Sequence, residues 1–342
     1  MRIVNDVRWG LGRDAYERAS TRFVEMCDSC GVGRDQIGFF GAVGFPGVSD
    51  LDALVVGDQA TLVRLAALHR EEARKSDVYG YLFWHEPLWI LEEVKDDAYR
   101  LHTMDGLKRA DGRAELSVAG VVSEEARRVL DVAWLIFLLG AVAEMGCVAK
   151  GRRGLSLRLL LLVHKNLRHS MRVFRSADNT RGDGLMGANE LRQWAKERCQ
   201  QGNEAEAGRV VWAQIVGSLA EACAGMDATC ERLVGDIDAM APWIITRRMV
   251  FCRGTGTTYE ESRGRIVLNP YAFMVAKGYL YGRSCGSDVG HFGMTARHSR
   301  LAYERAGLAY PFIEPIMIAR RGWKKWLTLG VNRLADTLFR VF

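Results

Sequence analysis

The sequence predicts an α+β protein, with a small mixed β-sheet and its helices first and a larger, mainly helical domain after it. Up to about residue 120, short β-like runs alternate with segments whose apolar residues follow helical spacing. Beyond residue 123, long segments keep the helical period. A chain of 342 residues is long enough for two domains. We therefore expect an α/β domain over residues 1–120 and a mainly helical domain over residues 121–342.

The first domain begins with a helix whose apolar positions Ala15, Ala19 and Phe23 recur at helical spacing and whose stop signal is Gly31. Two β-like runs follow on either side of the turn-rich stretch GAVGFPGVSD. In order, the expected elements are a helix over 14–27, strands over 37–40 and 51–56, a helix over 60–75, and an aromatic strand over 78–84 that resumes at 88–91 after Pro87.

The second domain is predicted to contain helices and a β-hairpin. Ser123-Glu124-Glu125 is typical of a helix start, and a long apolar run follows it. The expected elements are helices over 129–148, 155–174, 189–200 and 204–240, the last with a break near Gly225, and strands within 243–253 and at 265–268. A Gly/Thr-rich turn at 254–258 lies between the two strands, so it predicts a hairpin near residues 243–268.

Composition narrows the class of protein. The chain is 26% charged and 49% hydrophobic, which is ordinary for a folded protein and excludes disordered or collagen-like chains. A net charge of +6 is too small to indicate nucleic-acid binding without a clustered basic patch. The 8 cysteines are not a disulfide framework in so long a chain, and Cys27 and Cys30 are interpreted as free thiols near a helix end.

The sequence also bears on where the protein resides. Its first twelve residues lack the apolar core of a secretory signal. The most apolar run, residues 132–149, includes Glu144 and predicts a buried helix and not a membrane span. We therefore expect a cytoplasmic protein without a transmembrane segment.

Asp50 and Asp52 are the residues that point most directly to chemistry. They lie two apart at the start of an apolar strand, so both carboxylates project from one face. Two like charges side by side are costly unless cations lie between them, and paired Mg²⁺ ions about 3.5–4 Å apart serve phosphoryl and nucleotidyl transfer. The preceding Gly41, Gly44 and Gly47 predict a turn whose N–H groups approach phosphate. The alternative is a strand end that shows two carboxylates to water.

This segment resembles the signature of the polymerase-beta-like nucleotidyltransferase superfamily. Phe40-Gly41-Ala42 matches its hydrophobic-Gly-Gly/Ser part, and Asp50-Leu51-Asp52-Ala53 matches its Asp-hydrophobic-Asp/Glu-hydrophobic part, with Ser49 just ahead. Ala42 departs from the family's Gly or Ser, and the spacer between the two parts is short. The resemblance implies a nucleotidyltransferase-like mixed sheet, two Mg²⁺ ions held by Asp50 and Asp52, and a nucleoside triphosphate that faces Gly41, Ala42 and Ser49.

The resemblance also implies a third carboxylate on a later strand of the sheet, which binds metal and in many members acts as general base. Glu86, at the end of the aromatic strand, is the first candidate, and Glu115 is the alternative. The stretch 101–112 resembles the short helix and turn that often follows this sheet, which favours Glu86. His85 beside it is either a support for a metal ligand or a structural histidine.

A basic helix face is the candidate partner of the triphosphate. Lys165, Arg168, His169 and Arg172 lie at i, i+3, i+4 and i+7 of one expected helix and so share a face. Triphosphate needs positive charge opposite its metals, which makes Lys165 and Arg168 candidate ligands. The alternative is the solvated side of an amphipathic helix.

These observations predict a Mg²⁺-dependent nucleotidyltransferase that moves a nucleoside monophosphate from a nucleoside triphosphate, ATP among the candidates, to an acceptor hydroxyl. A small-molecule acceptor is favoured, with a protein or nucleic acid as the alternative. Two other functions stay open. One is a catalytically inactive nucleotidyltransferase-like scaffold, which Ala42 suggests. The other is membrane or nucleic-acid association through the basic-aromatic tail at 320–326.

Overall fold

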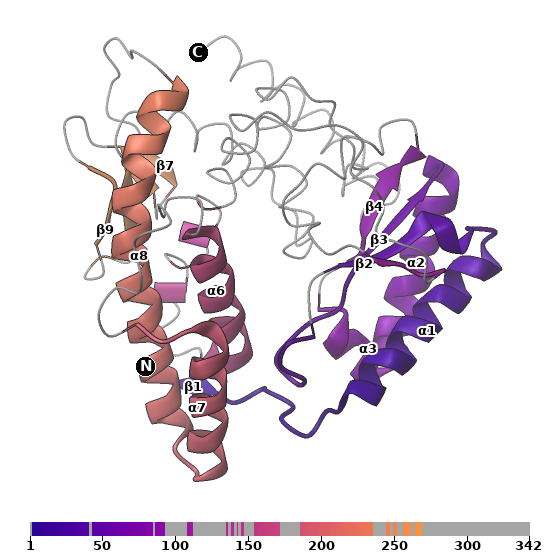
Figure 1. The fold of residues 1–342 in the computed structure, drawn as a ribbon, viewed down its shortest axis with the longest axis horizontal. Coiled ribbons are helices and arrows are strands. Elements are labelled where there is room, and N and C mark those ends of the chain that lie inside the picture. Colours follow the sequence, from indigo (N-terminus) through magenta and orange to yellow (C-terminus); the bar gives the residue numbers. More distant parts are fainter. Residues whose placement is uncertain are drawn as a thin grey trace. The chain divides into compact units, whose positions relative to one another are not determined.

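A computed structural model of the chain describes residues 2–40, 43–84, 86–92, 108–111, 154–171, 185–234, 244–246, 249–251, 256–260, 263 and 265–268, with helical positions 135, 138, 139, 142, 145 and 146. These residues form a mixed α+β structure, which confirms the predicted class at that level. They divide into two compact units, one from residues 11–111 and the other from 2–10 with 135–268 (Figure 1). The expected boundary near residue 120 lies outside the described residues.

The α/β unit is built on a four-stranded mixed sheet with the order β4-β3-β2-β5. Its strands are β2 (Ile37–Phe40), β3 (Asp52–Gly57), β4 (Leu88–Leu91) and the two-residue β5 (Lys108–Arg109). β2 pairs antiparallel with both β3 and β5, whereas β3 pairs parallel with β4. The first three strands confirm the predicted ones, with β3 shifted by one residue. β5 falls where a short helix and turn were expected, so that expectation is wrong at these two positions.

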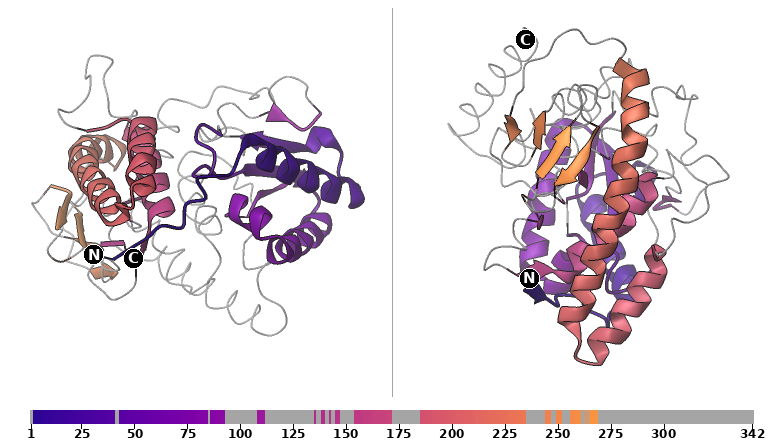
Figure 2. Two further views of the ribbon diagram at one scale, coloured as in Figure 1. Left: turned by 90° about the horizontal axis from the view of Figure 1, so that it is seen from below. Right: turned by 90° about the vertical axis from the view of Figure 1, so that its left-hand side faces the viewer.

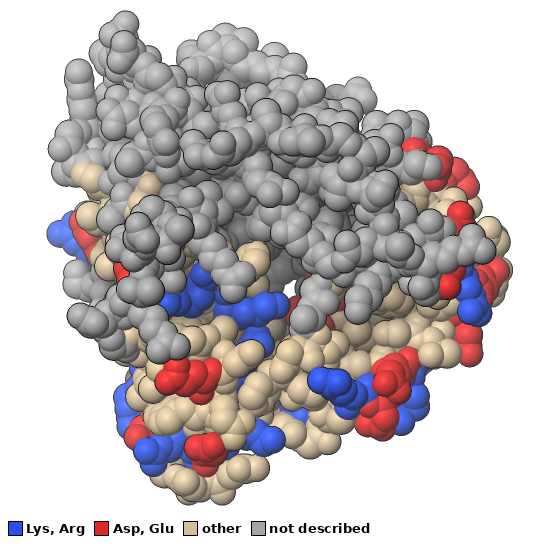
Figure 3. All heavy atoms as spheres, in the orientation of Figure 1, with Lys and Arg blue, Asp and Glu red and all other residues tan. Residues whose placement is uncertain are grey.

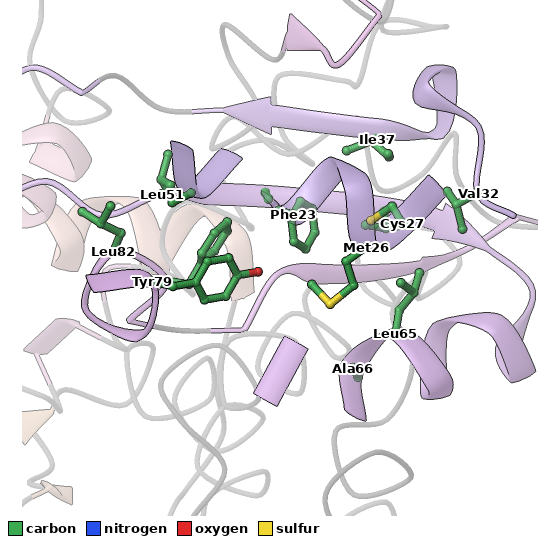
Figure 4. Close-up of a cluster of buried hydrophobic side chains, with 14 of the residues drawn as sticks. Phe23, Met26, Cys27, Val32, Ile37, Leu51, Leu65, Ala66, Tyr79 and Leu82 are labelled. Carbon is green, nitrogen blue, oxygen red and sulfur yellow. The ribbon is translucent and has the colours of Figure 1, made fainter. Parts of the chain in front are cut away.

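Helices cover one face of this sheet. α1 (Arg13–Ser29) and α2 (Gln59–Lys75) lie side by side against it (Figures 1 and 2). Both helices confirm the predicted ones, with bounds longer by one or two residues at some ends. Side chains from these helices, the following short helix and the sheet form one buried cluster (Figure 4). Phe23 is fully buried within it, with its ring centroid 5.2 Å from that of Phe83.

The segment around β3 contributes alternate side chains to that cluster. Leu51, Ala53 and Val55 are all buried in it. Because successive side chains of a strand point to opposite faces, Asp52 and Leu54 point to the face away from α1 and α2. This alternation decides on which side of the sheet Asp52 lies.

Local signals determine where the helices begin and end. Gly31 follows α1 with a φ of 81°, a conformation that glycine adopts readily, and so confirms the predicted stop. Asp58 caps α2, because its side chain accepts the N–H groups of Ala60 and Thr61. These hydrogen bonds, chiefly with Thr61, lower the pKa of the Asp58 carboxyl.

The aromatic stretch 78–84 is helical as far as Leu82 and forms no strand, so the predicted strand there is wrong. α3 (Asp77–Leu82) begins at Ser76, whose hydroxyl accepts the N–H of Tyr79. Tyr79, Leu82 and Phe83 recur at helical spacing and are all buried in the cluster that α1 and α2 also line. Packing at i, i+3 and i+4 outweighs the β propensity of the aromatic residues.

The cysteine interpretation is confirmed for the two residues near the end of α1. Cys27 and Cys30 are both free thiols and both buried. Burial raises the pKa of the Cys27 thiol to about 12, so it stays protonated and unreactive at neutral pH.

The second unit contains a group of three packed helices. They are α6 (Leu157–Ser170), α7 (Ala188–Gln200) and α8 (Glu204–Val234). α6 and α8 lie within predicted helices, and α7 begins one residue before its predicted helix. α8 runs through Gly225 without interruption, so the expected break there is wrong. β1 (Ile3–Val4) pairs parallel with β6 (Leu155–Ser156), which joins the first residues of the chain to this unit and not to the α/β unit.

A second four-stranded sheet follows α8, with the order β7-β8-β10-β9. Its strands are β7 (Ile244–Thr246), β8 (Met249–Phe251), β9 (Thr258–Glu260) and β10 (Arg265–Leu268). A hairpin would need β8 and β10 to pair antiparallel, but they pair parallel. The antiparallel partner of β10 is β9. The hairpin predicted between 243–253 and 265–268 is therefore wrong, because an additional strand begins at Thr258.

Two further predictions concern the rest of the chain. The positions described within the expected helix 129–148 are helical. In the described part of the chain, no helix is both long and apolar enough to cross a membrane. The basic-aromatic segment at 320–326 lies outside the described residues.

Candidate functional site

Asp50 and Asp52 lie at the start of β3, where the chain enters the sheet. Asp52 is the first residue of β3 and pairs with Phe40 of β2. Both aspartates are half-buried, while Leu51 between them is only 6% exposed and lies in the helix-side cluster. Asp50 itself precedes β3, so the expectation that its carboxylate shares a face with that of Asp52 stays a prediction, which the burial of Leu51 between them favours.

The turn before the aspartates, residues 45–49, is held together by its own backbone. The N–H groups of Val48 and Ser49 both donate to the carbonyl of Phe45, at 3.1 and 2.9 Å. The N–H of Phe45 in return donates to the Ser49 hydroxyl at 3.2 Å. Gly47 has a φ of 85°, which a residue with a side chain rarely adopts. The glycine is therefore required by the shape of the turn.

Two tyrosines attach this turn to the helices. The Tyr16 hydroxyl, on α1, donates to the carbonyl of Ser49 at 2.7 Å and accepts the N–H of Gly47 at 3.0 Å. The Tyr81 hydroxyl, on α3, donates to the carbonyl of Gly47 at 2.5 Å. Sequence reasoning missed both residues, because a helical spacing pattern reveals that a tyrosine is buried but not which distant group its hydroxyl reaches.

These bonds limit which groups could face a phosphate. Within residues 45–49 every backbone N–H has an acceptor, and Pro46 has no N–H to offer. The predicted phosphate contacts would therefore fall to residues 41–44. Gly41 and Ala42, two of the predicted ligands, lie outside the described residues.

Ser49, another predicted nucleotide ligand, is built into the turn. It is 3% exposed, and its N–H, carbonyl and hydroxyl all bond within the turn or to Tyr16. In this conformation Ser49 supports the site and does not present its side chain to a ligand.

Glu86 lies just before β4, the parallel neighbour of β3, and not at the end of an aromatic strand. The register pairs Leu54 with Leu88, so continuing it by two residues would bring position 86 beside position 52. Both Glu86 carboxylate oxygens nevertheless accept hydrogen bonds on the helix side. The Arg70 guanidinium of α2 forms an ion pair with them, and the Trp89 indole N–H lies 3.2 Å from Oε2.

The described conformation therefore does not bring the three predicted carboxylates together. Trp89 belongs to the helix-side cluster, whereas Asp52 points to the other face. In the described part of the chain, no group of three or more His, Cys, Asp or Glu side chains is arranged to hold a metal ion. Glu115 and His85, the other residues considered near the third carboxylate, lie outside the described residues.

The candidate triphosphate face on α6 has a partner within its own unit. Arg168 lies 3.3 Å from Glu221 of α8 and its side chain is only 11% exposed. Lys165 is half-buried and His169 is exposed, while Arg172 lies outside the described residues. Arg168 thus contributes to packing between α6 and α8, which favours the structural interpretation for this residue.

Several exposed charges among the described residues of the α/β unit occur in pairs. Asp14 and Arg18 of α1 lie 2.6 Å apart, and so do Glu71 and Lys75 of α2. On the face shown in Figure 3, acidic and basic side chains of the described residues are interspersed. Such alternation is typical of a solvated surface and not of a nucleic-acid-binding stripe.

Comparison of this chain with protein-family models, with curated proteins and with solved structures gave no match.

Proposed function

We propose that the α/β unit is a metal-dependent nucleotidyltransferase that transfers a nucleoside monophosphate from a nucleoside triphosphate to an acceptor hydroxyl, with a small molecule as the favoured acceptor. The observation that carries this proposal is the placement of Asp50 and Asp52. They flank the buried Leu51 at the entrance to a strand of a mixed sheet, directly after an internally bonded turn. Two carboxylates fixed two residues apart on one face provide oxygen ligands suited to Mg²⁺.

The chemistry requires the acceptor oxygen to attack the α-phosphorus while the bond to the bridging oxygen of pyrophosphate breaks. The acceptor hydroxyl gives up its proton, and pyrophosphate leaves in line. Mg²⁺ held by Asp50 and Asp52 would neutralise the triphosphate and the charge that develops on the leaving group. The chain's own contribution is to hold the two carboxylates in place, because catalysis of this type depends on positioning and charge.

Glu86 enters this proposal as the third carboxylate and acceptor of the proton. The parallel pairing of β3 and β4 supports the choice, because continuing its register by two residues would bring position 86 beside position 52. The ion pair with Arg70 and the bond from Trp89 define what must change for Glu86 to act. A base role requires its carboxylate to leave Arg70 and turn to the face of Asp52.

A second candidate function is nucleotide binding without catalysis. The specific observation that favours it is the engagement of both Glu86 oxygens by Arg70 and Trp89, which holds this carboxylate away from the face of Asp52. The two functions share the metal and the triphosphate but differ in turnover.

The two candidates are separated by measuring binding and turnover on the same samples. Calorimetry with each of the four ribonucleoside triphosphates and Mg²⁺ reports binding, and release of pyrophosphate reports transfer. An enzyme shows both, and Glu86→Gln then abolishes release while retaining binding. Binding without release in the wild-type chain supports the scaffold. If binding and release both persist unchanged in Asp50→Ala and Asp52→Ala, these aspartates are not the site of either candidate function.

A further inference from the structure

We infer that Tyr16 is a positioning residue for the Asp50–Asp52 site, acting through the backbone on either side of Asp50. The inference rests on the proposed function, because it assigns Tyr16 a part in metal binding by these aspartates. Tyr16 lies on α1, 34 positions before Asp50 in the numbering of the chain, and is 3% exposed. Its hydroxyl is the polar end of an otherwise buried side chain, so the position of that oxygen is fixed by packing.

Two peptide groups flank Asp50, and each is hydrogen-bonded to a different helix. The first includes the carbonyl of Ser49, which accepts a hydrogen bond from the Tyr16 hydroxyl at 2.7 Å. The second includes the N–H of Leu51, which donates to the carbonyl of Leu82 at the end of α3, at 2.9 Å. With one peptide group fixed by α1 and the other by α3, the backbone torsions of Asp50 are restricted from both sides. The direction of its side chain is restricted with them.

The same hydroxyl also fixes the turn that precedes Asp50. Tyr16 accepts the N–H of Gly47, whose φ of 85° makes this the least adaptable point of the turn. Tyr81 holds the carbonyl of the same glycine from α3. Removing the Tyr16 hydroxyl would deprive the Gly47 N–H and the Ser49 carbonyl of this partner while leaving the aromatic ring in the core.

Tyr79 offers a matched control. It is also 3% exposed and belongs to the same buried cluster as Tyr16. Its hydroxyl lies 2.9 Å from Nδ1 of His69, away from the turn. Tyr79→Phe therefore removes one buried hydroxyl from the same core, as Tyr16→Phe does, but without altering the bonds around Asp50.

The test uses the full chain and Mn²⁺ as the probe, followed by electron paramagnetic resonance, with the thermal midpoint measured on each sample. We expect Tyr16→Phe to weaken Mn²⁺ binding by about 10-fold or more, as is common when a residue that orients a metal ligand is lost. Tyr79→Phe should lower the thermal midpoint about as much as Tyr16→Phe does, because it also removes a buried hydrogen bond. It should leave Mn²⁺ affinity within about twofold of the wild type, because that bond is to His69 and not to the turn before Asp50. Tyr81→Phe should give a weakening between the two.

The possible failures are distinguishable. If the wild-type chain binds Mn²⁺ and Asp52→Asn abolishes binding, but Tyr16→Phe binds as tightly as Tyr79→Phe, the inference about Tyr16 is wrong and the metal site stands. If the wild-type chain binds no Mn²⁺, or Asp52→Asn leaves binding unchanged, the proposed site fails and the role of Tyr16 fails with it. Amide hydrogen exchange at Gly47 gives a second readout: exchange in Tyr16→Phe no faster than in Tyr79→Phe would overturn the claim that the hydroxyl holds the turn.

Discussion

At the scale of single residues, His164 of α6 is a buried imidazole in a positively charged setting. It is 1% exposed, and its Nε2 has no hydrogen-bond partner among the described residues. Burial, with smaller contributions from the charges of Arg168 and Arg192, lowers the pKa of His164 to about 4. An unfolded histidine has a pKa near 6.5, so between these values the unfolded state binds more protons than the folded one.

The stability of the helical unit should therefore fall in mild acid. The sign follows from the direction of proton uptake: as pH decreases from 6.5 to about 4, unfolding gains a proton and becomes more favourable, by up to about 3 kcal/mol. Urea unfolding at a series of pH values measures this loss. His164→Gln should flatten the dependence, whereas His169→Gln, at an exposed position on the same helix, should preserve it. Equal pH dependence in wild type and His164→Gln would contradict the assignment.

Single residues also show how far sequence reasoning reaches in the candidate site. The burial of Leu51 between Asp50 and Asp52 could be predicted, because alternation of apolar and polar residues is a local property of the sequence. The contacts of Tyr16 with the turn and of Arg70 with Glu86 could not be predicted. They join side chains on different elements, and their existence depends on how helices pack against the sheet and not on local spacing.

At the scale of elements, α3 is the clearest case in which tertiary packing overrides local preference. Its aromatic residues favour a strand, but the Ser76 cap and the burial of Tyr79, Leu82 and Phe83 produce a short helix. The strands and helices that were predicted correctly have local patterns that agree with their packing. Antiparallel pairs do occur within residues 243–268, between β7 and β8 and between β9 and β10. The expected pairing of 243–253 with 265–268 as a hairpin is wrong, because the parallel pairing of β8 with β10 depends on contacts between separate segments.

α3 also packs against α2 more closely than most side chains would allow. A Cβ at Gly80 would lie 2.5 Å from the backbone oxygen of Ala73 on α2. Replacing glycine by alanine within a helix ordinarily stabilises it by about 1 kcal/mol. Here we expect Gly80→Ala to lower the free energy of unfolding by about 1–3 kcal/mol, because a backbone atom must move to admit the methyl group.

Urea unfolding of Gly80→Ala measures this reversal of sign. Gly10→Ala is a suitable control, because a Cβ there meets nothing within 4 Å. It should change stability little. A Gly80→Ala variant as stable as the wild type would show that α2 and α3 do not approach as closely as described.

At the scale of the whole molecule, residues 2–10 belong to the helical unit, together with the described residues from 135 to 268. The pairing of Ile3 and Val4 with Leu155 and Ser156 joins segments about 150 positions apart in the numbering of the chain. A domain of residues 1–120 was the natural expectation, since the sequence has no local signal for such a pairing. An α/β segment followed by a helical one could be predicted from periodicity. The membership of the first ten residues in the helical unit could not.

Deleting residues 2–10 should accordingly destabilise the helical unit selectively. The deletion removes β1, the Asp6 carboxylate that accepts the N–H of Arg158 at 3.1 Å, and the Ile3 side chain that occupies the space above Gly208. Hydrogen exchange should become faster in α6 and in the first turns of α8 and stay unchanged in α1 and α2. Gly208→Val in the full chain should reproduce the effect by displacing Ile3. Faster exchange confined to α1 and α2 would contradict the assignment.

The central claim is that Asp50 and Asp52 hold the metal for nucleotidyl transfer. It is tested most directly by Mg²⁺-dependent release of pyrophosphate from ribonucleoside triphosphates by the wild-type chain, Asp50→Asn and Asp52→Asn. Asp58→Asn is the control, because Asp58 caps α2 and asparagine is also a good cap. We predict release by the wild type and by Asp58→Asn, and a loss of about 100-fold or more in each of the other two variants. Equal release by all four proteins, or no release by any of them, would contradict the claim.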